Sequence, residues 1–295
     1  MTPRIVGIGE VLWDLLPAGR QMGGAPANVI CHAAMMGADT TLVSRVGSDE
    51  LGREIAGNLR SIGVRTDCLQ SDAERPTGTV GVELDVQGQP RFTIHEDVAW
   101  DRIADHPSSR AAIAAAQAIC FGTLARRSEP SRSCIRSLLH SASPASLRLL
   151  DVNLRPPFNS FAVIAEALAD ANALKINDDE LPRLAELFHL AGDVRSQIRQ
   201  IAEEKGLRLV ALTRGAHGSL LYLGGQWSDH PGVPVKVVDA VGAGDSFTAT
   251  LILGTLAGWD LDRVNQQANQ VAAYVCSHPG ATPSLPPRFR EAFAS

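Results

Sequence analysis

Residues 239–248 read Asp-Ala-Val-Gly-Ala-Gly-Asp-Ser-Phe-Thr, and an apolar helical run continues from there to Ala257. A glycine-rich turn that opens a helix offers free backbone N–H groups and the positive end of the helix dipole, and both attract phosphate. Gly242 and Gly244 would let the backbone approach a phosphate closely. Asp245 would add a carboxylate that could orient and deprotonate an attacking hydroxyl. The stretch is therefore typical of a phosphoryl-transfer site.

The same stretch also has a purely structural explanation, in which Asp245 caps a helix after a flexible turn. Spacing alone does not separate the two explanations. Two other phosphate-binding motifs are missing from the sequence. No Gly-Lys-Ser/Thr follows the turn, so it is not a Walker loop, and no Gly-x-Gly-x-x-Gly follows the first predicted strand, so it is not a dinucleotide fingerprint.

Short apolar strands alternate with helical segments along most of the chain. We predict strands at residues 5–9, 40–46, 118–121, 147–151, 173–176 and 207–213. Helices are predicted at 27–36 and 51–62, each followed by a glycine. This alternation predicts an α/β fold with a mostly parallel central sheet and helices on both faces. Ligands of such sheets bind beyond the carboxyl ends of the strands.

Two stretches break this alternation. Residues 11–16 and 77–94 have the pattern of antiparallel strands, with a turn at 87–89. We expect them to form a small sheet, within about 11–16 and 77–100, that projects as a lid from a single domain spanning 1–295. The exposed edges of such a sheet could pair between two chains, so a homodimer through the lid is possible.

Composition excludes several classes of protein. The net charge of −5 and the lack of basic runs argue against a nucleic-acid binder. The longest apolar stretch, 111–125, is too short to span a membrane. Five widely spaced cysteines without a Cys-x-x-Cys motif indicate neither a disulfide framework nor a zinc site and suit a reducing compartment. With no basic leader before the first strand, we expect no signal peptide and a cytoplasmic protein.

The segment 239–248 resembles the C-terminal signature of the ribokinase-like (PfkB) carbohydrate kinases, commonly Asp-Thr-x-Gly-Ala-Gly-Asp, with Ala240 in place of Thr. The segment 23–28, Gly-Gly-Ala-Pro-Ala-Asn, followed by Gly37 and by 46–52, resembles the N-terminal signature of the same family. The resemblance covers nearly the whole chain. It implies the ribokinase-like fold and transfer of the γ-phosphate of ATP to a hydroxyl of a small sugar.

The resemblance also implies roles for individual residues. Asp245 would be the general base, and the amides of Gly242, Ala243 and Gly244 would form the anion hole. Sugar hydroxyls would be bound by Asp14, Gly23, Gly24 and Asn28, of which Asn28 has the alternative role of a helix cap. ATP would be bound by the matching residues Asn177, Glu180, Thr213, Arg214, Gly215, Gly218, Asn269 and Arg155.

Two metal ions are implied in the same way. Residues 177–180 match the Asn-x-x-Glu motif that is linked to Mg²⁺, and Glu180 would act on the ion through water. The local alternative is that an acidic residue simply stabilises the first turn of a helix. Potassium would be held between two loops by Asp239, Val241, Gly280 and Ser284, without the hydroxyl that Thr would supply at position 240.

Residues 9–17 followed by 23–28 look most like the bacterial fructokinases, which implies fructose as substrate. Three other substrates stay open: ribose, 2-keto-3-deoxygluconate with Arg91 or Arg102 as its cationic partner, and a nucleoside with Trp13 or Phe92 as its platform. A non-catalytic sugar- or nucleotide-binding regulator on the same fold is the alternative from another class. The intact Asp245 motif disfavours it, since a regulator needs no base.

Overall fold

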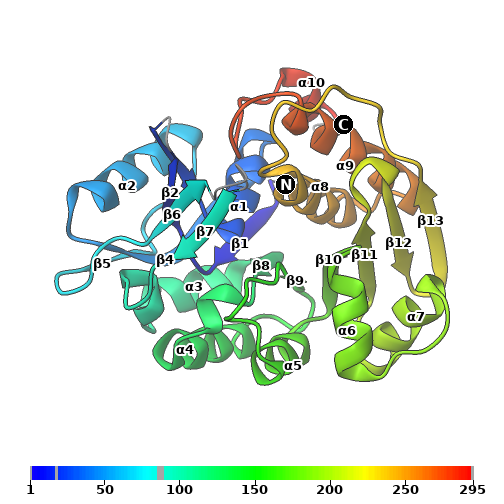
Figure 1. Ribbon diagram of the computed structural model, residues 1–295, viewed down its shortest axis with the longest axis horizontal. Coiled ribbons are helices and arrows are strands. Elements are labelled where there is room, and N and C mark those ends of the chain that lie inside the picture. The colour runs from blue at the N-terminus through cyan, green and yellow to red at the C-terminus, as the bar shows by residue number, and fades with distance from the viewer. Residues whose placement is uncertain (1, 17–18, 85–89, 294–295) are drawn as a thin grey trace.

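The computed structural model describes residues 2–16, 19–84 and 90–293, and over these ranges its larger sheet has nine strands. In spatial order, from right to left in Figure 1, they are β13 (Gln226–His230), β12 (Ser219–Leu223), β11 (Leu209–Thr213), β10 (Ala173–Asn177), β9 (Leu147–Asp151), β8 (Ala118–Phe121), β1 (Arg4–Ile8), β4 (Asp39–Gly47) and β5 (Leu69–Asp72). All neighbouring pairs are parallel from β11 to β5, whereas β12 and β13 are antiparallel. The mostly parallel sheet is confirmed.

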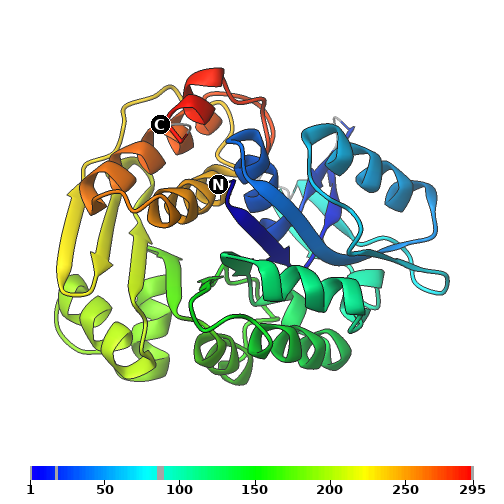
Figure 2. The same ribbon diagram turned by 180° about the vertical axis from the view of Figure 1, so that it is seen from behind.

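Helices cover both faces of this sheet (Figures 1 and 2). One face carries α3 (Pro107–Ala115), α4 (Glu129–His140), α5 (Phe161–Asp170), α6 (Glu180–Phe188) and α7 (Val194–Lys205). The other face carries α1 (Ala25–Met35), α8 (Ala243–Leu256), α9 (Leu261–Cys276) and α10 (Pro287–Glu291), with α2 (Glu50–Ile62) packed beside α1. The α/β fold class, with helices on both faces of a mostly parallel sheet, is confirmed.

The alternation of side chains along β1 shows how one strand serves two cores. Val6 and Ile8 are buried against the helices of one face, and Ile5 is buried against those of the other. A Cβ at Gly7 would lie 2.8 Å from the carbonyl oxygen of Pro26. The glycine therefore lets α1 pack tightly on the strand, which brings the first turn of α1 to the carboxyl end of the sheet.

A separate four-stranded sheet has the order β3 (Gly19–Gly23), β2 (Leu12–Leu16), β6 (Thr79–Leu84) and β7 (Pro90–Ile94). The prediction of an entirely antiparallel arrangement was wrong, because β2 and β6 are parallel. The chain between them returns through β4 and β5 of the larger sheet, so both strands start from the same side. The strand β3 was not predicted, since Arg20 and Gln21 interrupt its apolar pattern.

Two further details concern residues 77–100, which were predicted to contribute to the small sheet. Residues Ala99–Arg102 form a short 3₁₀ helix, η1, and not strand as far as residue 100. The predicted turn at 87–89 lies outside the described residues.

The apolar stretch 111–125 is divided between α3, β8 and a second short 3₁₀ helix, η2 (Leu124–Arg126). Within the described ranges, no helix has both the length and the apolar character needed to cross a membrane.

Candidate active site

The predicted site residues gather where the strands of the larger sheet end and helices α1, α6 and α8 begin. Of these residues, Asn177 is the last of β10 and Thr213 is the last of β11, and Asp151, the last residue of β9, lies at the same edge. Glu180 opens α6. Parallel strands present their carboxyl ends at one edge, so this edge is where a ligand of the sheet would bind.

The glycine-rich turn leads into α8 as predicted. Gly242 is the N-cap residue, with the left-handed conformation at φ 78°, and no side chain caps the helix. Asp245 lies inside the first turn, so its interpretation as a helix cap was wrong. The backbone amides of Gly244 and Asp245 make no hydrogen bond to any described residue, and that of Ala243 makes only a long one of 3.4 Å to the carbonyl of Ala240. These amides are free to bind an anion.

Asn28 holds the Asp245 carboxylate from the opposite helix. Its Nδ2 donates to Asp245 Oδ2 at 2.8 Å, between residues 217 positions apart in the chain. Asn28 is buried on α1, whose N-cap residue is Gly24, so the capping alternative for Asn28 was wrong. Only one carboxylate oxygen of Asp245 is engaged by Asn28, which leaves the other for a substrate hydroxyl.

The electrostatic surroundings make Asp245 more basic than an ordinary aspartate. Burial raises its pKa to about 6, and repulsion from Asp151 adds to the increase. The hydrogen bond from Asn28 and the positive charges of Lys175 and Arg155 act in the opposite direction. A carboxylate with a pKa close to neutrality is better matched to accepting a hydroxyl proton than one with a pKa near 4.

Lys175 is a buried residue of this site that the sequence interpretation missed. Its Nζ lies 3.1 Å from Asp151 Oδ1, and Thr248 Oγ1 donates to the other oxygen of Asp151 at 3.1 Å. Burial alone would lower the pKa of Lys175, but attraction to Asp151, Glu180 and Asp245 outweighs burial and raises it. The available signal was a single lysine inside the apolar strand 173–176.

Asn177 and Glu180 bind one another at the start of α6. Glu180 Oε2 accepts from the amide of Asn177 at 2.9 Å, and Oε1 accepts from the amide of Leu154 at 2.8 Å. Asn177 Oδ1 in turn accepts from the amide of Glu180 at 2.8 Å. Burial raises the pKa of Glu180, while Lys175 lowers it. Because both oxygens already accept backbone bonds, this donor set suits a hydrated Mg²⁺ held through water better than one ligated directly.

The four-stranded sheet contributes Asp14 on β2 and Gly23 on β3, and Gly24 follows as the N-cap residue of α1. A Cβ at Gly23 would displace the carboxylate of Asp14. Gly24 has φ 108° with the Glu10 carbonyl beside it, so a larger residue would be strained there. Burial raises the pKa of Asp14 to about 6. Gln21 pairs directly with Asp14 across β2 and β3 and was not predicted as a site residue.

A second buried carboxyl group, Glu10, was also missed. Its side chain is 3% exposed, and Oε2 has no hydrogen-bond partner among the described residues. Burial raises its pKa to about 7, and the exposed Arg155 opposes the increase. Arg155 therefore faces the charges of Glu10, Asp14 and Asp245 together, which is a suitable position for a cation that meets phosphate.

Two of the residues predicted to bind ATP, Arg214 and Asn269, use their side chains for contacts within the protein. The Arg214 guanidinium donates to Asp229 Oδ1 at 2.6 Å and to two backbone carbonyls of β12 and β13. Asn269 donates to Ser219 Oγ at 2.7 Å and to the carbonyl of Asn265 on its own helix. Arg214 thus joins the end of β11 to the hairpin of β12 and β13, and Asn269 joins α9 to β12.

The glycines of the predicted nucleotide loop have structural roles of their own. Gly215 opens the short 3₁₀ helix η3 (Gly215–His217) with φ 54°. Gly218 has φ 76°, and a Cβ there would overlap the backbone of His230 and Gly232. The loop after β11 is therefore tightly built around these glycines.

The two loops predicted to hold potassium do meet. Asp239 Oδ1 accepts from the amide of Val241 at 3.0 Å, and Oδ2 accepts from the amide of Gly280 at 3.0 Å. The carbonyl of Ser284 already accepts from the Tyr274 hydroxyl at 3.1 Å. The remaining carbonyls of these loops are hard oxygen donors that suit an alkali ion. Among the described residues no cluster of three His, Cys, Asp or Glu side chains could hold a metal by itself.

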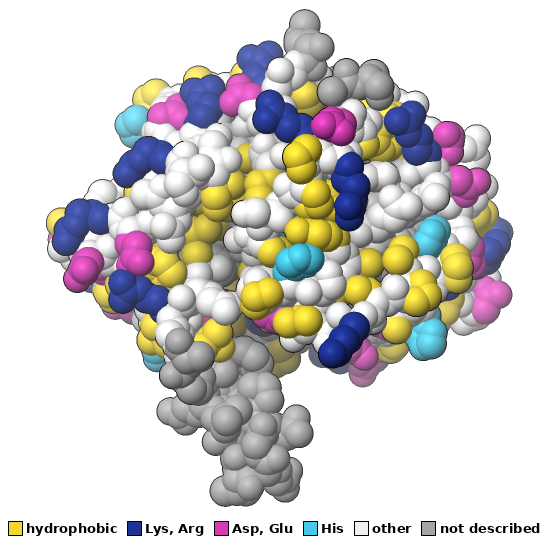
Figure 3. Space-filling model, turned by 90° about the horizontal axis from the view of Figure 1, so that it is seen from above, with side chains coloured by type: hydrophobic (Ala, Val, Ile, Leu, Met, Phe, Trp, Pro, Cys, Tyr) yellow, Lys and Arg dark blue, Asp and Glu magenta, His cyan; other side chains and the backbone are white. Residues whose placement is uncertain are grey.

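Apolar side chains are exposed on the segment that leads into the α8 turn. Val237, Val238 and Val241 are 50–60% exposed, and Val233 and Val235 nearly 40%. The segment crosses the upper side of Figure 1, and Figure 3 shows hydrophobic side chains gathered on that face. Exposed apolar surface next to free amides would accommodate an anion that carries a flat apolar group.

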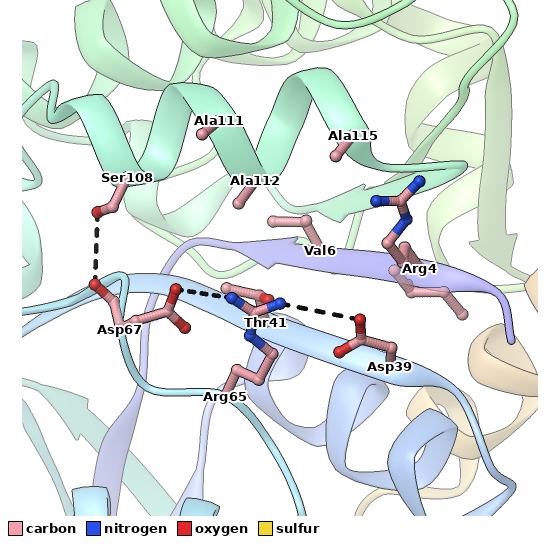
Figure 4. Close-up of a pocket in the computed structure, with 11 residues that line it drawn as sticks. Arg4, Val6, Asp39, Thr41, Arg65, Asp67, Ser108, Ala111, Ala112 and Ala115 are labelled. Atoms are coloured by element: carbon pink, nitrogen blue, oxygen red, sulfur yellow. Dashed lines mark hydrogen bonds and ion pairs between the residues drawn. The ribbon is translucent and has the colours of Figure 1, made fainter.

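A pocket of about 370 Å³ lies at the other end of the sheet, between α3 and the first residues of β1 and β4 (Figure 4). Within it Arg65 pairs with Asp67 at 3.0 Å and with Asp39 at 3.8 Å. No predicted site residue lines this pocket. It is therefore separate from the candidate active site.

Comparison with known proteins agrees with this geometry. The model of the pfkB family carbohydrate kinases matches residues 18–288. A fructokinase of Klebsiella pneumoniae is 32% identical over 268 residues, which cover 87% of this chain and 86% of that protein.

Solved structures are similar over almost the entire chain. The crystal structure of an uncharacterized sugar kinase from Pyrococcus horikoshii in complex with ATP has a TM-score of 0.80 and 28% identity, and the match covers 96% of this chain and 95% of that one. A fructokinase of Vibrio cholerae with bound fructose, ADP and calcium ion has a TM-score of 0.80 and 25% identity, covering 100% and 99%. A double mutant of that fructokinase is described with bound potassium ion.

Proposed function

Because the chain belongs to the pfkB family of carbohydrate kinases, we propose that it transfers the γ-phosphate of ATP to a primary hydroxyl of fructose, with Asp245 as the general base. The observation that carries the proposal is the position of Asp245. It directly follows Gly244, whose amide has no hydrogen-bond partner among the described residues, and Asn28 orients its carboxylate at 2.8 Å. A base and an anion hole thus stand in one turn of α8, as phosphoryl transfer requires.

The groups around Asp245 would bind the different parts of ATP in this proposal. The amides of Gly242, Ala243 and Gly244 bind charge that accumulates on the phosphate oxygens. Arg155 supplies a positive charge at the rim. A hydrated Mg²⁺ near Asn177 and Glu180 would neutralise the charge of ATP when bound. The exposed valines before the turn provide an apolar surface for the adenine ring, although the side chains of Arg214 and Asn269 are occupied elsewhere.

A potassium ion is proposed at the junction of the two C-terminal loops. Asp239 already joins these loops through the amides of Val241 and Gly280. An ion bound to their carbonyls would stabilise the turn that precedes the anion hole. The double mutant of the Vibrio cholerae fructokinase, a similar solved structure described with bound potassium ion, supports this proposal.

Fructose is the favoured sugar because the fructokinases are among the relatives. Two of the residues considered for other substrates, Trp13 and Arg102, make contacts within the protein. Trp13 is buried and donates to the carbonyl of Leu51 at 3.1 Å, so it offers no open platform for a nucleoside base. Arg102 lies 3.5 Å from Asp97. The side chains of Arg91 and Phe92 lie outside the description of the structure.

ADP release from ATP and Mg²⁺ tests the proposal, measured with fructose, ribose, 2-keto-3-deoxygluconate and adenosine, with and without K⁺. We expect fructose to give the strongest signal and K⁺ to increase it. Activity with another sugar would retain the mechanism and reject fructose. If folded protein binds ATP and sugar but transfers no phosphate to any member of a wider panel, the non-catalytic regulator becomes the better explanation.

The pH dependence of catalysis should follow Asp245. Since the base acts as a carboxylate, kcat/KM for the sugar should fall by about tenfold per pH unit below a pH of about 6. The measurement is the pH profile of kcat/KM, repeated with Glu10→Gln as the control. A profile that falls already near pH 7, and no longer does so in Glu10→Gln, would assign the pH dependence to Glu10 instead.

A further inference from the structure

His32 is a fully buried side chain to which the proposed reaction assigns no part. It lies on α1, one helical turn after Asn28. Its Nε2 lies 2.9 Å from the carbonyl oxygen of Ala281. A carbonyl oxygen can only accept, so Nε2 carries the hydrogen and donates it. The bond joins residues 249 positions apart, and it ties α1 to the loop that follows α9.

The Ala281 carbonyl is in turn packed against Gly242, the first residue of the glycine-rich turn whose amides form the proposed anion hole. Gly242 has φ 78°, and a Cβ at this position would overlap the carbonyl oxygen and carbon of Ala281. The neighbouring Gly280 amide is held by Asp239, which precedes the same turn. A displacement of the Ala281 carbonyl would therefore displace Gly242 and the free amides that follow it.

We propose that His32 is a positioning residue for phosphate binding: its Nε2–H fixes the Ala281 carbonyl, and through it the Gly242–Gly244 amides. The inference rests on the proposed function, in which these amides bind the phosphates of ATP. Two residues of α1, one helical turn apart, would then position the site: Asn28 orients the base, and His32 orients the anion hole.

The chemistry of the position favours a neutral hydrogen-bond donor. Burial lowers the pKa of His32 to about 4, so the imidazole stays uncharged near neutral pH. Ala281 is 5% exposed, and little water is available to replace the bond if the donor is removed. An apolar residue would leave the carbonyl unpaired, whereas the amide of a glutamine could donate from nearly the same position as Nε2.

Two variants of similar size test the proposal. His32→Leu removes the donor, and His32→Gln keeps one. We expect His32→Leu to weaken ATP binding, measured by calorimetry with Mg²⁺, by about tenfold or more, the order of effect of an unpaired buried acceptor. His32→Gln should stay within about threefold of the original protein, and KM for the sugar should change little in either variant. Val29→Ala, which opens a cavity on the same helix, controls for loss of stability.

The outcomes separate this inference from the proposed function. If His32→Leu and His32→Gln bind ATP equally well, or if Val29→Ala weakens binding as much as His32→Leu, His32 has only a structural role and the inference is wrong. Calorimetry does not depend on the identity of the sugar, so a wrong substrate leaves the test valid. If the unmodified protein binds no ATP, the proposed function fails first and the inference fails with it.

Discussion

The Asp245→Asn variant should turn over about 10²–10⁴-fold more slowly than the original protein, the usual contribution of a positioned base. Asparagine has nearly the same shape as aspartate, and its carbonyl oxygen can still accept the bond from Asn28. Only the ability to take up the hydroxyl proton is lost. Affinities for sugar and ATP, measured by calorimetry, should therefore change much less than turnover.

A matched substitution distinguishes this effect from a general effect on helix termini. Asp262 is also an acidic residue in the first turn of a helix, but it lies on α9, outside the candidate site. Asp262→Asn should keep normal turnover. Near-normal turnover of Asp245→Asn would mean that the base has been assigned to the wrong residue.

The Lys175→Met variant should lose about 3–5 kcal/mol of folding free energy, because it removes one partner of a buried ion pair. Asp151 would keep its bond from Thr248 but lose its one ion-pair partner among the described residues. Losing the positive charge should also raise the pKa of Asp245 further, since Lys175 now lowers it. The measurement is urea unfolding, combined with the pH profile of kcat/KM.

Two variants serve as controls for Lys175→Met. Lys236→Met alters an exposed lysine and should change stability by no more than about 0.5 kcal/mol. The double variant Lys175→Met with Asp151→Asn removes both charges and should recover part of the lost stability. If the single Lys175→Met variant is as stable as Lys236→Met, the ion pair does not stabilise the fold.

The sequence was most informative where a local pattern dictates local structure. Apolar runs located β8 and β9 to the residue, and the glycines after α1 and α2 marked where these helices end. The glycine-rich motif located the start of α8 and the base. The paired glycines 224 and 225, both with positive φ, join β12 to β13 and were a hairpin signal that was overlooked.

Predictions were poorer where a side chain's partner is distant in the chain. Lys175 lay inside a predicted strand, but nothing nearby indicated that Asp151 would pair with it. Conversely, Arg214 matched a nucleotide motif, yet Asp229 on the adjacent hairpin binds its guanidinium. Motif matching identifies positions and does not identify which side chains are free.

The sequence by itself determined the class of the fold, the glycine-rich turn before α8 and the position of Asp245, because these depend on the residues within one or two turns of chain. Only the tertiary structure decided that Asn28 holds Asp245 and that His32 reaches Ala281. The physical reason is distance along the chain. A hydrogen bond across more than 200 residues exists only after the sheet has assembled and brought α1 against α8, and no local pattern records it.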